Sequence, residues 1–461
     1  MKKKIAYKCS NCGYISQGYF GKCPHCNKWN TLEEFDENNN SEKSHSQNKD
    51  AVILKNVDSK ESSRVMTDIM EFNRVMGGGI VRDSVSILTA KPGAGKSTLL
   101  LQVANDLAKK GFVVLYASGE ESQSQIKRRA TRILDKLSEN IWVSSTTFLD
   151  DVLEQIKTVD PDFIIIDSIQ TFVLKEFNSR PGTPTQTMEC AYKMVDIAKN
   201  SKRPRFVFMV GQMTKDDELA GVRSLEHLVD TVLVIEGESS EELRSLMATK
   251  NRYGSTGEMG FFTMTESGIK SLDNPSLYFC TLRQEDNSPP GSSLSVIREG
   301  TRPIILETEA LTSKSFMPYP SRVGECIKRE HLNTLISILE ERANIRLMDK
   351  NVVIKTNGNI KLRDSASNLS IMMSIVSSNL NKPIINNKVF IADVGLTGEL
   401  KNIPSLELRI KEAERMGFKE AYIADIKSIN EDKFKGIKLI KIGHISQVIE
   451  KIFSWGKRLK K

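Results

Sequence analysis

The chain contains no long apolar run. Across its 461 residues, no stretch approaches the ~20 apolar residues that a membrane-spanning helix needs. The amino terminus reads Met-Lys-Lys-Lys-Ile-Ala-Tyr, which is basic but lacks the apolar core of a secretion signal. The sequence therefore predicts a cytoplasmic protein with no membrane partner, in a compartment where structural disulfides are rare.

A strong charge of one sign is absent as well. The 66 lysines and arginines exceed the 58 acidic residues only moderately, which gives a net charge of +8. Such an excess is compatible with a polyanionic partner but is weak evidence by itself. The length predicts two to four domains and an ample core.

Composition divides the chain into four segments. Residues 1–35 hold four of the seven cysteines. Residues 36–63 are polar and charged, which predicts a flexible linker. Residues 64–285 alternate apolar runs with helical patterns, and a Pro/Gly/Ser joint at 288–293 introduces the last segment, 286–461.

The segment 64–285 has the pattern of an α/β three-layer domain. Continuous apolar runs such as Phe163-Ile164-Ile165-Ile166 are typical of parallel strands that helices cover on both faces. The last segment also mixes strands, such as 352–354 and 389–391, with helices at 329–343 and 406–416, so we expect a second α/β domain. The strands expected in the first of these domains are 85–89, 112–117, 163–167, 205–210 and 231–235.

Residues 90–98 read Ala-Lys-Pro-Gly-Ala-Gly-Lys-Ser-Thr, between the apolar run 85–88 and a helical pattern at 99–108. A strand, a glycine-rich turn and a helix are the context of a phosphate-binding P-loop. We expect Lys96 to reach the β- and γ-phosphates of ATP and Ser97 to hold Mg²⁺. A glycine-rich turn that merely precedes a lysine is the competing interpretation. The predicted nucleotide-binding residues are Ala90, Lys91, Pro92, Gly93, Ala94, Gly95, Lys96 and Ser97.

Acidic residues follow two of the predicted strands. Asp167 ends the run 163–167, which suits a water-mediated contact to Mg²⁺, whereas a helix-capping aspartate is the alternative. Glu120 lies after strand 112–117, within Ser-Gly-Glu-Glu-Ser, where it could act as the general base for the attacking water. It or Glu121 could instead cap the helix that begins near residue 123. Gln212 is a candidate sensor of the γ-phosphate.

Four cysteines form two Cys-x-x-Cys turns near the amino terminus. Such turns, ten residues apart, supply four thiolates that can enclose Zn²⁺ in a tetrahedron. A segment of this length cannot build a core, so the metal would supply its folding energy. A redox-active pair or unpaired thiols are the alternatives. The predicted zinc ligands are Cys9, Cys12, Cys23 and Cys26.

A short polar turn combines two cations, an amide and an aromatic ring. It could contact DNA phosphates, or it could project an arginine toward the ATP of a neighbouring subunit. An exposed basic turn without a function is the alternative. The turn consists of Lys250, Asn251, Arg252, Tyr253 and Gly254.

The order of these motifs resembles the bacterial RadA (Sms) family of DNA-repair ATPases. The resemblance rests on the zinc module, the P-loop, Asp167-Ser168-Ile169-Gln170-Thr171 and the turn at 250–254, and it extends through 225–232, 299–303 and 394–399. It implies a RecA-like core, ATP with Mg²⁺, Zn²⁺, and a motor on single-stranded and branched DNA that promotes branch migration. It also implies a hexameric ring, a RecA-type recombinase as partner, and catalytic roles for Lys96, Glu120, Asp167 and Arg252.

The C-terminal segment, most clearly from 349 to 461, resembles the family's domain related to the Lon protease. By that similarity Ser367 falls near the nucleophile position, and Glu407 falls where the activating lysine should be. A carboxylate cannot replace a desolvated lysine there, so we expect a scaffold without proteolytic activity. The rival hypothesis is a Lon-like ATP-dependent protease.

Overall fold

The computed structural model divides the chain into two compact units, Met1–Glu61 and Ser62–Lys461. Cys12 and nearly all of the predicted linker 36–63 lie outside the described residues. The residues described are 6–9, 15–16, 18, 20–24, 26, 28–29, 31–35, 53, 55, 64–212, 225–237, 241–281, 288–385, 387–426 and 429–453.

The first unit contains a small antiparallel sheet with the strand order β2-β1-β3. Its core consists of cysteine side chains, because Cys9 and Cys23 are buried with Tyr7 and Cys26 packed against them. Such a short segment has no other apolar core among its described residues. The strands are β1 (Ala6–Cys9), β2 (Ile15–Ser16) and β3 (Leu32–Phe35).

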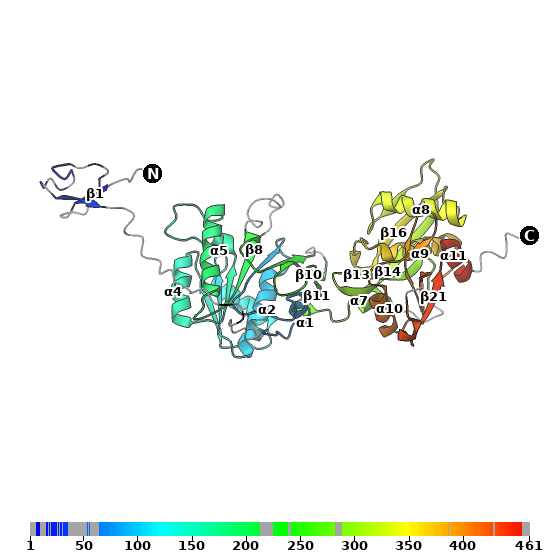
Figure 1. The fold of residues 1–461 in the computed structure, drawn as a ribbon, viewed down its shortest axis with the longest axis horizontal. Coiled ribbons are helices and arrows are strands. Elements are labelled where there is room, and N and C mark those ends of the chain that lie inside the picture. The colour runs from blue at the N-terminus through cyan, green and yellow to red at the C-terminus, as the bar shows by residue number, and fades with distance from the viewer. Residues whose placement is uncertain are drawn as a thin grey trace, which may run out of the picture. The chain divides into compact units, whose positions relative to one another are not determined.

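The second unit is built around a nine-stranded sheet with the order β12-β11-β10-β9-β4-β8-β7-β5-β6. Figure 1 labels β8, β10 and β11 of this sheet. Six neighbouring strands are parallel, and the last three in sequence extend the sheet antiparallel from β9. The parallel strands are β4 (Val85–Ala90), β5 (Val114–Ser118), β6 (Ile141–Ser145), β7 (Phe163–Asp167), β8 (Phe206–Gln212) and β9 (Thr231–Glu236). The antiparallel strands are β10 (Leu243–Asn251), β11 (Met259–Thr265) and β12 (Gly268–Ser271).

Helices cover both faces of this sheet, as the continuous apolar runs predict. One face packs its alternate residues, such as Leu88 and Phe208, against the first three helices. The opposite face packs residues such as Ile87 and Ile164 against the next two. The helices of the first face are α1 (Met70–Val75), α2 (Lys96–Lys109) and α3 (Gln123–Ile133), and those of the second are α4 (Leu149–Val159) and α5 (Pro184–Ala198).

The predicted α/β class is confirmed, and each of the five expected strands is present. The sequence reading missed β6, because it is an edge strand in which only Ser144 is buried and the apolar signal is weak. It also missed the antiparallel extension β10–β12, whose alternating pattern continues the sheet without a helical crossover.

The C-terminal region is also α/β, as predicted. Ser292 and Ser293, which the sequence reading placed in a joint, are buried residues of the first strand. One sheet has the order β13-β14-β16-β15, a parallel one β17-β20-β21, and β18 pairs with β19. The strands are β13 (Ser292–Glu299), β14 (Arg302–Lys314), β15 (Arg322–Gly324), β16 (Lys350–Thr356), β17 (Lys388–Ile391), β18 (Asp393–Val394), β19 (Leu400–Lys401), β20 (Glu420–Ala424) and β21 (Lys438–Ile442).

Helices complete the core of this region. Its largest apolar cluster also includes Phe261 of β11 and Phe279 of α7, so apolar packing continues across residue 285. The domain border at that residue stays a prediction. The helices are α7 (Pro275–Phe279), α8 (Arg329–Ala343), α9 (Asn368–Leu380), α10 (Leu406–Arg415) and α11 (Ile445–Phe453). In the part of the chain that the structure describes, no helix combines the length and apolarity needed to cross a membrane.

Candidate nucleotide-binding site

The glycine-rich turn joins the central strand β4 to helix α2. Gly95 precedes the helix with φ at 102°, a left-handed conformation that favours glycine. A Cβ atom there would lie 2.5 Å from Cε of Met264 and 2.9 Å from Cδ1 of Ile269, so the ends of these two flexible side chains would have to move. Lys96 folds back over the turn and donates a hydrogen bond to the carbonyl oxygen of Ala90 at 2.7 Å. The first turn of α2 thus presents its free N–H groups beside a lysine, as phosphate binding requires.

Asp167 meets the P-loop serine. Its Oδ2 accepts hydrogen bonds from Oγ of Ser97 at 2.7 Å and from the hydroxyl of Tyr116 at 2.5 Å. The carboxylate is buried, with 7% of the residue exposed. The helix-capping alternative does not hold, because these contacts are to another helix and another strand. A serine hydroxyl and a carboxylate side by side are donors that suit Mg²⁺.

Glu120 also faces the P-loop side of the sheet. Its Oε1 accepts hydrogen bonds from Oγ of Ser168 at 2.5 Å and from Nε2 of Gln212 at 2.9 Å. Neither glutamate of the Ser-Gly-Glu-Glu-Ser turn caps α3, because Ser122 does so through a reciprocal bond with Gln125. The sequence predicted Glu120 as the general base and Gln212 as the γ-phosphate sensor without relating them, and the structure brings the two side chains into contact.

These side chains share one cavity of about 400 Å³. Burial lowers the pKa of Lys96, and the carboxylates of Asp167 and Glu120 act in the opposite direction. Two arginines that the sequence reading did not single out, Arg129 and Arg132, also line the cavity. The described residues that line the cavity are Pro92, Gly93, Ala94, Gly95, Lys96, Ser97, Thr98, Glu120, Arg129, Arg132, Asp167, Val210, Gln212 and Met264.

The sequence reading also missed Tyr116 and Ser168. Tyr116 is a strand residue whose hydroxyl is buried against Asp167, and burial raises its pKa well above the ordinary value. No pattern in the sequence distinguishes it from an apolar core residue. Ser168 could have been found, because it directly follows the candidate Mg²⁺ ligand at the end of β7.

The turn at 250–254 lies at the other edge of the sheet. Asn251 pairs with Thr231, and Thr231 pairs with Ser86 at the start of β4. The P-loop follows the opposite end of that strand. The turn and the P-loop of one chain are therefore separated by the length of β4.

At that edge Arg252 makes a specific ion pair. Its Nη1 lies 2.9 Å from Oδ1 of Asp230, which is 1% exposed and also accepts a bond from the backbone N–H of Val85 at 3.0 Å. Nζ of Lys250 donates to the carbonyl oxygen of Glu226 at 2.6 Å. About half of the Arg252 side chain, 52%, remains exposed.

The close packing of Gly254 and Tyr253 fixes the shape of this turn. A Cβ atom on Gly254 would lie 2.8 Å from Cα of Gly77, so two backbones touch there. Tyr253 is partly buried, and burial together with Asp230 and Asp83 raises its pKa to about 12. Specific contacts therefore hold this turn in one conformation, unlike an unconstrained basic loop.

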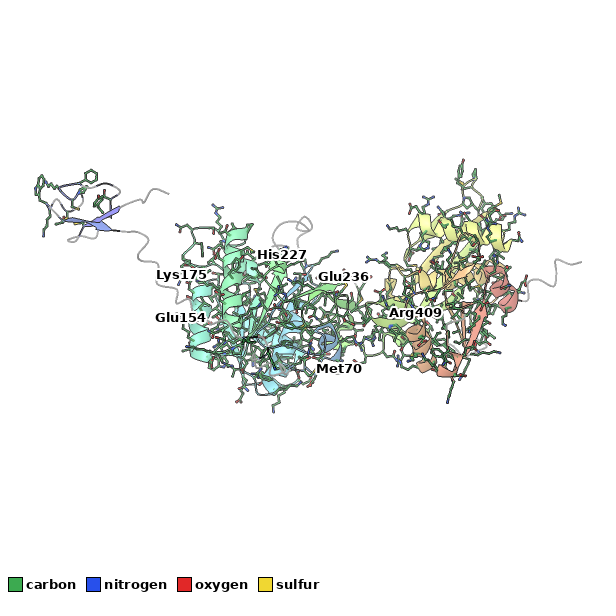
Figure 2. All side chains as sticks on the ribbon, viewed as in Figure 1. Met70, Glu154, Lys175, His227, Glu236 and Arg409 are labelled. Carbon is green, nitrogen blue, oxygen red and sulfur yellow. The ribbon has the colours of Figure 1, made fainter. Side chains whose placement is uncertain are left out.

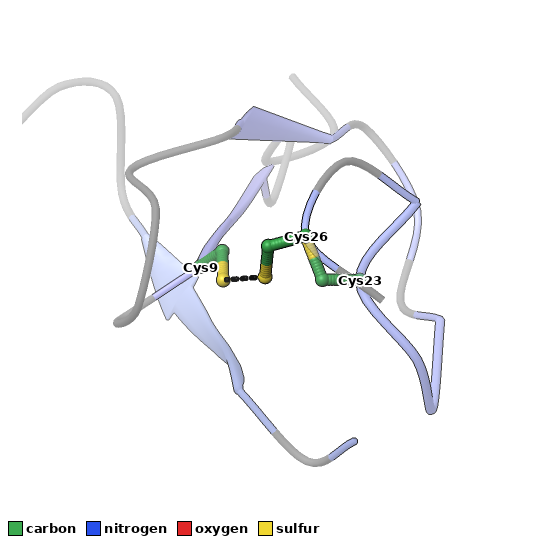
Figure 3. Close-up of side chains that lie close together, drawn as sticks. All are labelled: Cys9, Cys23 and Cys26. Carbon is green, nitrogen blue, oxygen red and sulfur yellow. Dashed lines mark hydrogen bonds between the residues drawn. The ribbon is translucent and has the colours of Figure 1, made fainter. Parts of the chain in front are cut away.

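Three cysteines of the first unit converge on one point (Figure 3). The Sγ atoms of Cys9, Cys23 and Cys26 all lie within 4.8 Å of one another, and those of Cys9 and Cys26 are 3.7 Å apart. Thiolates about 2.3 Å from a tetrahedral Zn²⁺ ion would be roughly 3.8 Å from each other. The described cysteines therefore fit zinc, and Cys12 lies outside the described residues.

Ser367 and Glu407 of the C-terminal region do not form a nucleophile–base pair. Ser367 is 1% exposed, and its hydroxyl donates to the carbonyl oxygen of Asp364 at 2.8 Å. Glu407 forms an ion pair with Lys433 at 3.1 Å. The buried Arg409 (Figure 2) contacts the carboxylate of Asp364 at 2.6 Å. The contacts of Ser367 and Arg409 are those of a structural core, whereas the Glu407–Lys433 ion pair lies at the surface.

Two family models match the chain. Residues 54–218 match an AAA domain, which contains the P-loop, Glu120 and Asp167. Residues 7–34 match a rubredoxin metal binding domain, which contains the cysteine cluster. The two matches coincide with the cavity and with the cysteine cluster described above.

Whole-length relatives also match. The chain is 39% identical over 455 residues to a protein of Bacillus subtilis (strain 168) called DNA repair protein RadA, covering 97% of this chain and 98% of that protein. Proteins of the same name from Listeria monocytogenes and Chlamydia pneumoniae are 38% and 37% identical, covering 98% and 95% of this chain and 98% of each relative. The chain therefore belongs to the RadA family of DNA repair proteins.

Proposed function

We propose that this protein is a DNA-dependent ATPase that processes recombination intermediates by promoting branch migration. The observation that carries the ATPase part is the hydrogen bond between Ser97 and Asp167, which joins the P-loop to the end of β7 beside Lys96. The DNA part rests on membership of the family. ATP with Mg²⁺ and Zn²⁺ are the expected cofactors.

Each cavity residue has a distinct role in this proposal. The N–H groups of the P-loop and Lys96 bind the phosphates, and Ser97 and Asp167 hold Mg²⁺. When bound, Mg²⁺ neutralises charge on the β- and γ-phosphate oxygens. Ser168 and Gln212 fix Oε1 of Glu120, so we assign the other carboxylate oxygen to the attacking water.

The turn at 250–254 would couple hydrolysis to DNA. Since it lies at the opposite edge of the sheet from its own P-loop, Arg252 serves an ATP molecule in a neighbouring subunit or a DNA phosphate. Such coupling implies a ring, which we propose to be a hexamer, acting on single-stranded or branched DNA. A RecA-type recombinase would supply the strand-exchange intermediates.

ATP turnover with and without single-stranded DNA tests this function. We expect DNA to stimulate turnover, and we expect Lys96→Ala to abolish both turnover and the extension of joint molecules. An ATP turnover rate that DNA does not change would contradict the proposed DNA motor. Undiminished activity of the Lys96→Ala variant would contradict the proposed ATP site.

We propose that the C-terminal region is a scaffold without proteolytic activity. The buried Ser367 donates to a backbone carbonyl, and Glu407 is paired with Lys433, so no base lies in contact with the hydroxyl among the described residues. Digestion of casein by the wild type and by Ser367→Ala tests this. ATP-dependent cleavage that the substitution abolishes would establish the rival protease function.

A further inference from the structure

Helix α3 contributes a second cationic wall to the nucleotide cavity. Arg129 and Arg132 both line it, together with the P-loop and Thr98 of α2. The two arginines are three residues apart, so they lie on one face of the helix. Lys127 and Arg128 belong to the same helix but do not line the cavity.

The charge of the cavity depends on these arginines. Without them, its described lining would carry one cation, Lys96, against the two carboxylates of Glu120 and Asp167. A site with an excess of negative charge would repel a triphosphate. With them, the cations outnumber the carboxylates.

Arg129 is already paired with a carboxylate. Its Nη2 contacts Oε1 of Glu121, and about a quarter of each side chain is exposed. Glu121 does not line the cavity, whereas Arg129 does. The guanidinium can therefore exchange a carboxylate outside the cavity for an anion inside it, because both groups present oxygens to its fork of N–H donors.

We propose that Arg129 and Arg132 bind the phosphate chain of the nucleotide, and that Arg129 does so by leaving Glu121. This proposal rests on the ATP site proposed above and names two further binding residues in it. Glu121 then competes with the phosphate chain for Arg129. It binds the guanidinium while the cavity holds no nucleotide.

A purely structural ion pair would behave differently. If Arg129 and Glu121 only stabilised the turn before α3, removing either partner would change nucleotide affinity in the same direction. In the exchange model the two changes have opposite signs, because one removes a ligand of phosphate and the other removes its competitor.

The experiment measures binding of a non-hydrolysable ATP analogue and of ADP to the full-length protein with Mg²⁺. We expect Arg129→Gln and Arg132→Gln to weaken binding of the ATP analogue by roughly tenfold, the effect of losing a charge-assisted hydrogen bond. Arg128→Gln is the matched control, since it removes the same charge from the same helix outside the cavity, and its affinity should stay within about twofold of the wild type.

Glu121→Gln is the decisive variant. We expect it to strengthen binding about two- to fivefold, while thermal unfolding without nucleotide shows that it and Arg129→Gln lose similar stability. Weakened or unchanged binding in Glu121→Gln, or equal effects of Arg132→Gln and Arg128→Gln, would overturn the proposal. If Lys96→Ala leaves nucleotide binding intact, the ATP site itself is wrong, which is a separate failure.

Discussion

At the scale of single residues, the contacts of Asp167 decide what the cavity can do. Ser97 and Tyr116 share one of its oxygens, from a helix and from a neighbouring strand. The position of the carboxylate thus depends on a tyrosine whose hydroxyl is buried and has a raised pKa. Tyr116 therefore stays a hydrogen-bond donor throughout the physiological pH range.

Replacing Tyr116 by phenylalanine tests that dependence. We expect a loss of about 1 kcal/mol in the free energy of unfolding, because the buried Asp167 loses a donor, and a fall of roughly tenfold in ATP turnover. Urea denaturation and steady-state turnover measure the two effects. Tyr192→Phe, at an exposed position of α5, is the control. Equal behaviour of the two variants would show that the hydroxyl does not support Asp167.

Glu299 predicts a pH effect on stability. Burial, followed by Asp364 and Glu236, raises its pKa to about 7, and Arg363 opposes the shift. The folded state therefore holds a proton that the unfolded state loses above about pH 4.5, so this residue costs stability as the pH rises from about 4.5 through 7.

Glu299→Gln should remove this cost. We expect the variant to unfold with a free energy up to about 3 kcal/mol higher than the wild type at pH 8, and with an equal free energy near pH 4. Denaturation of both proteins at several pH values measures the difference. A difference that does not grow with pH would contradict the assigned titration.

At the scale of elements, two features of the turn before α2 favour a glycine, and the backbone conformation is the stronger one. Gly95 has a positive φ, and a Cβ atom there would meet Met264 and Ile269. Gly111, at the end of the same helix, has φ at 91° but nothing within 4 Å of a Cβ atom. A comparison of substitutions at these two glycines distinguishes the effect of backbone strain from that of side-chain contacts.

We expect Gly95→Ala to weaken nucleotide binding more than tenfold, since a residue with a Cβ atom strains the left-handed backbone of the P-loop at this position. Gly111→Ala should cost about 1 kcal/mol of stability, through strain alone, with unchanged nucleotide affinity. Titration with a fluorescent ATP analogue and thermal unfolding measure both. Full affinity in Gly95→Ala would show that the loop tolerates the side chain.

The small sheet β2-β1-β3 of the first unit depends on its cysteines. Cys9 and Cys23 form its core with no larger apolar residue buried among the described positions of that unit. Removing the metal with a chelator should therefore unfold the sheet β2-β1-β3 while ATP binding at the P-loop persists, because the other unit has its own cores. Limited proteolysis and nucleotide titration test this. Protection of the segment after the metal is lost would contradict a folding role for zinc.

At the scale of the whole molecule, one sheet separates the P-loop from the turn at 250–254. The P-loop follows the carboxyl ends of the parallel strands, and the turn at 250–254 lies at their amino ends. A side chain on a rigid sheet cannot reach across it, so the proposed function couples the two edges through a neighbouring copy or through DNA.

Mixing two inactive variants tests the first of these routes. If Arg252 completes the ATP site of a neighbour, a mixture of Lys96→Ala and Arg252→Ala chains contains interfaces with both residues intact. We expect the mixture to recover a measurable fraction of wild-type turnover, whereas neither variant alone does. Absence of recovery after subunit exchange would contradict a role for Arg252 in the ATP site of a neighbour.

The sequence predicted the central part of the fold well, because its signals are local. Each buried parallel strand is one apolar run, and the P-loop is a contiguous motif. The strands β6 and β10–β12 were not predicted, because the hydrophobic periodicity of an edge strand and of an antiparallel extension is weaker. In the site, Lys96, Ser97 and Asp167 were named from motifs, whereas Tyr116 and Arg132 carry no local signal of a role.

The sequence by itself determined which chemical groups this protein has: a phosphate-binding turn, two acidic residues at strand ends and paired cysteines. Their order along the chain was enough to indicate the family. Only the tertiary structure decided which groups meet. Parallel strands bring Asp167 and Glu120 to the P-loop, and helix α3 adds two arginines there. The same sheet carries Arg252 to the far edge, because β10 runs antiparallel to β4.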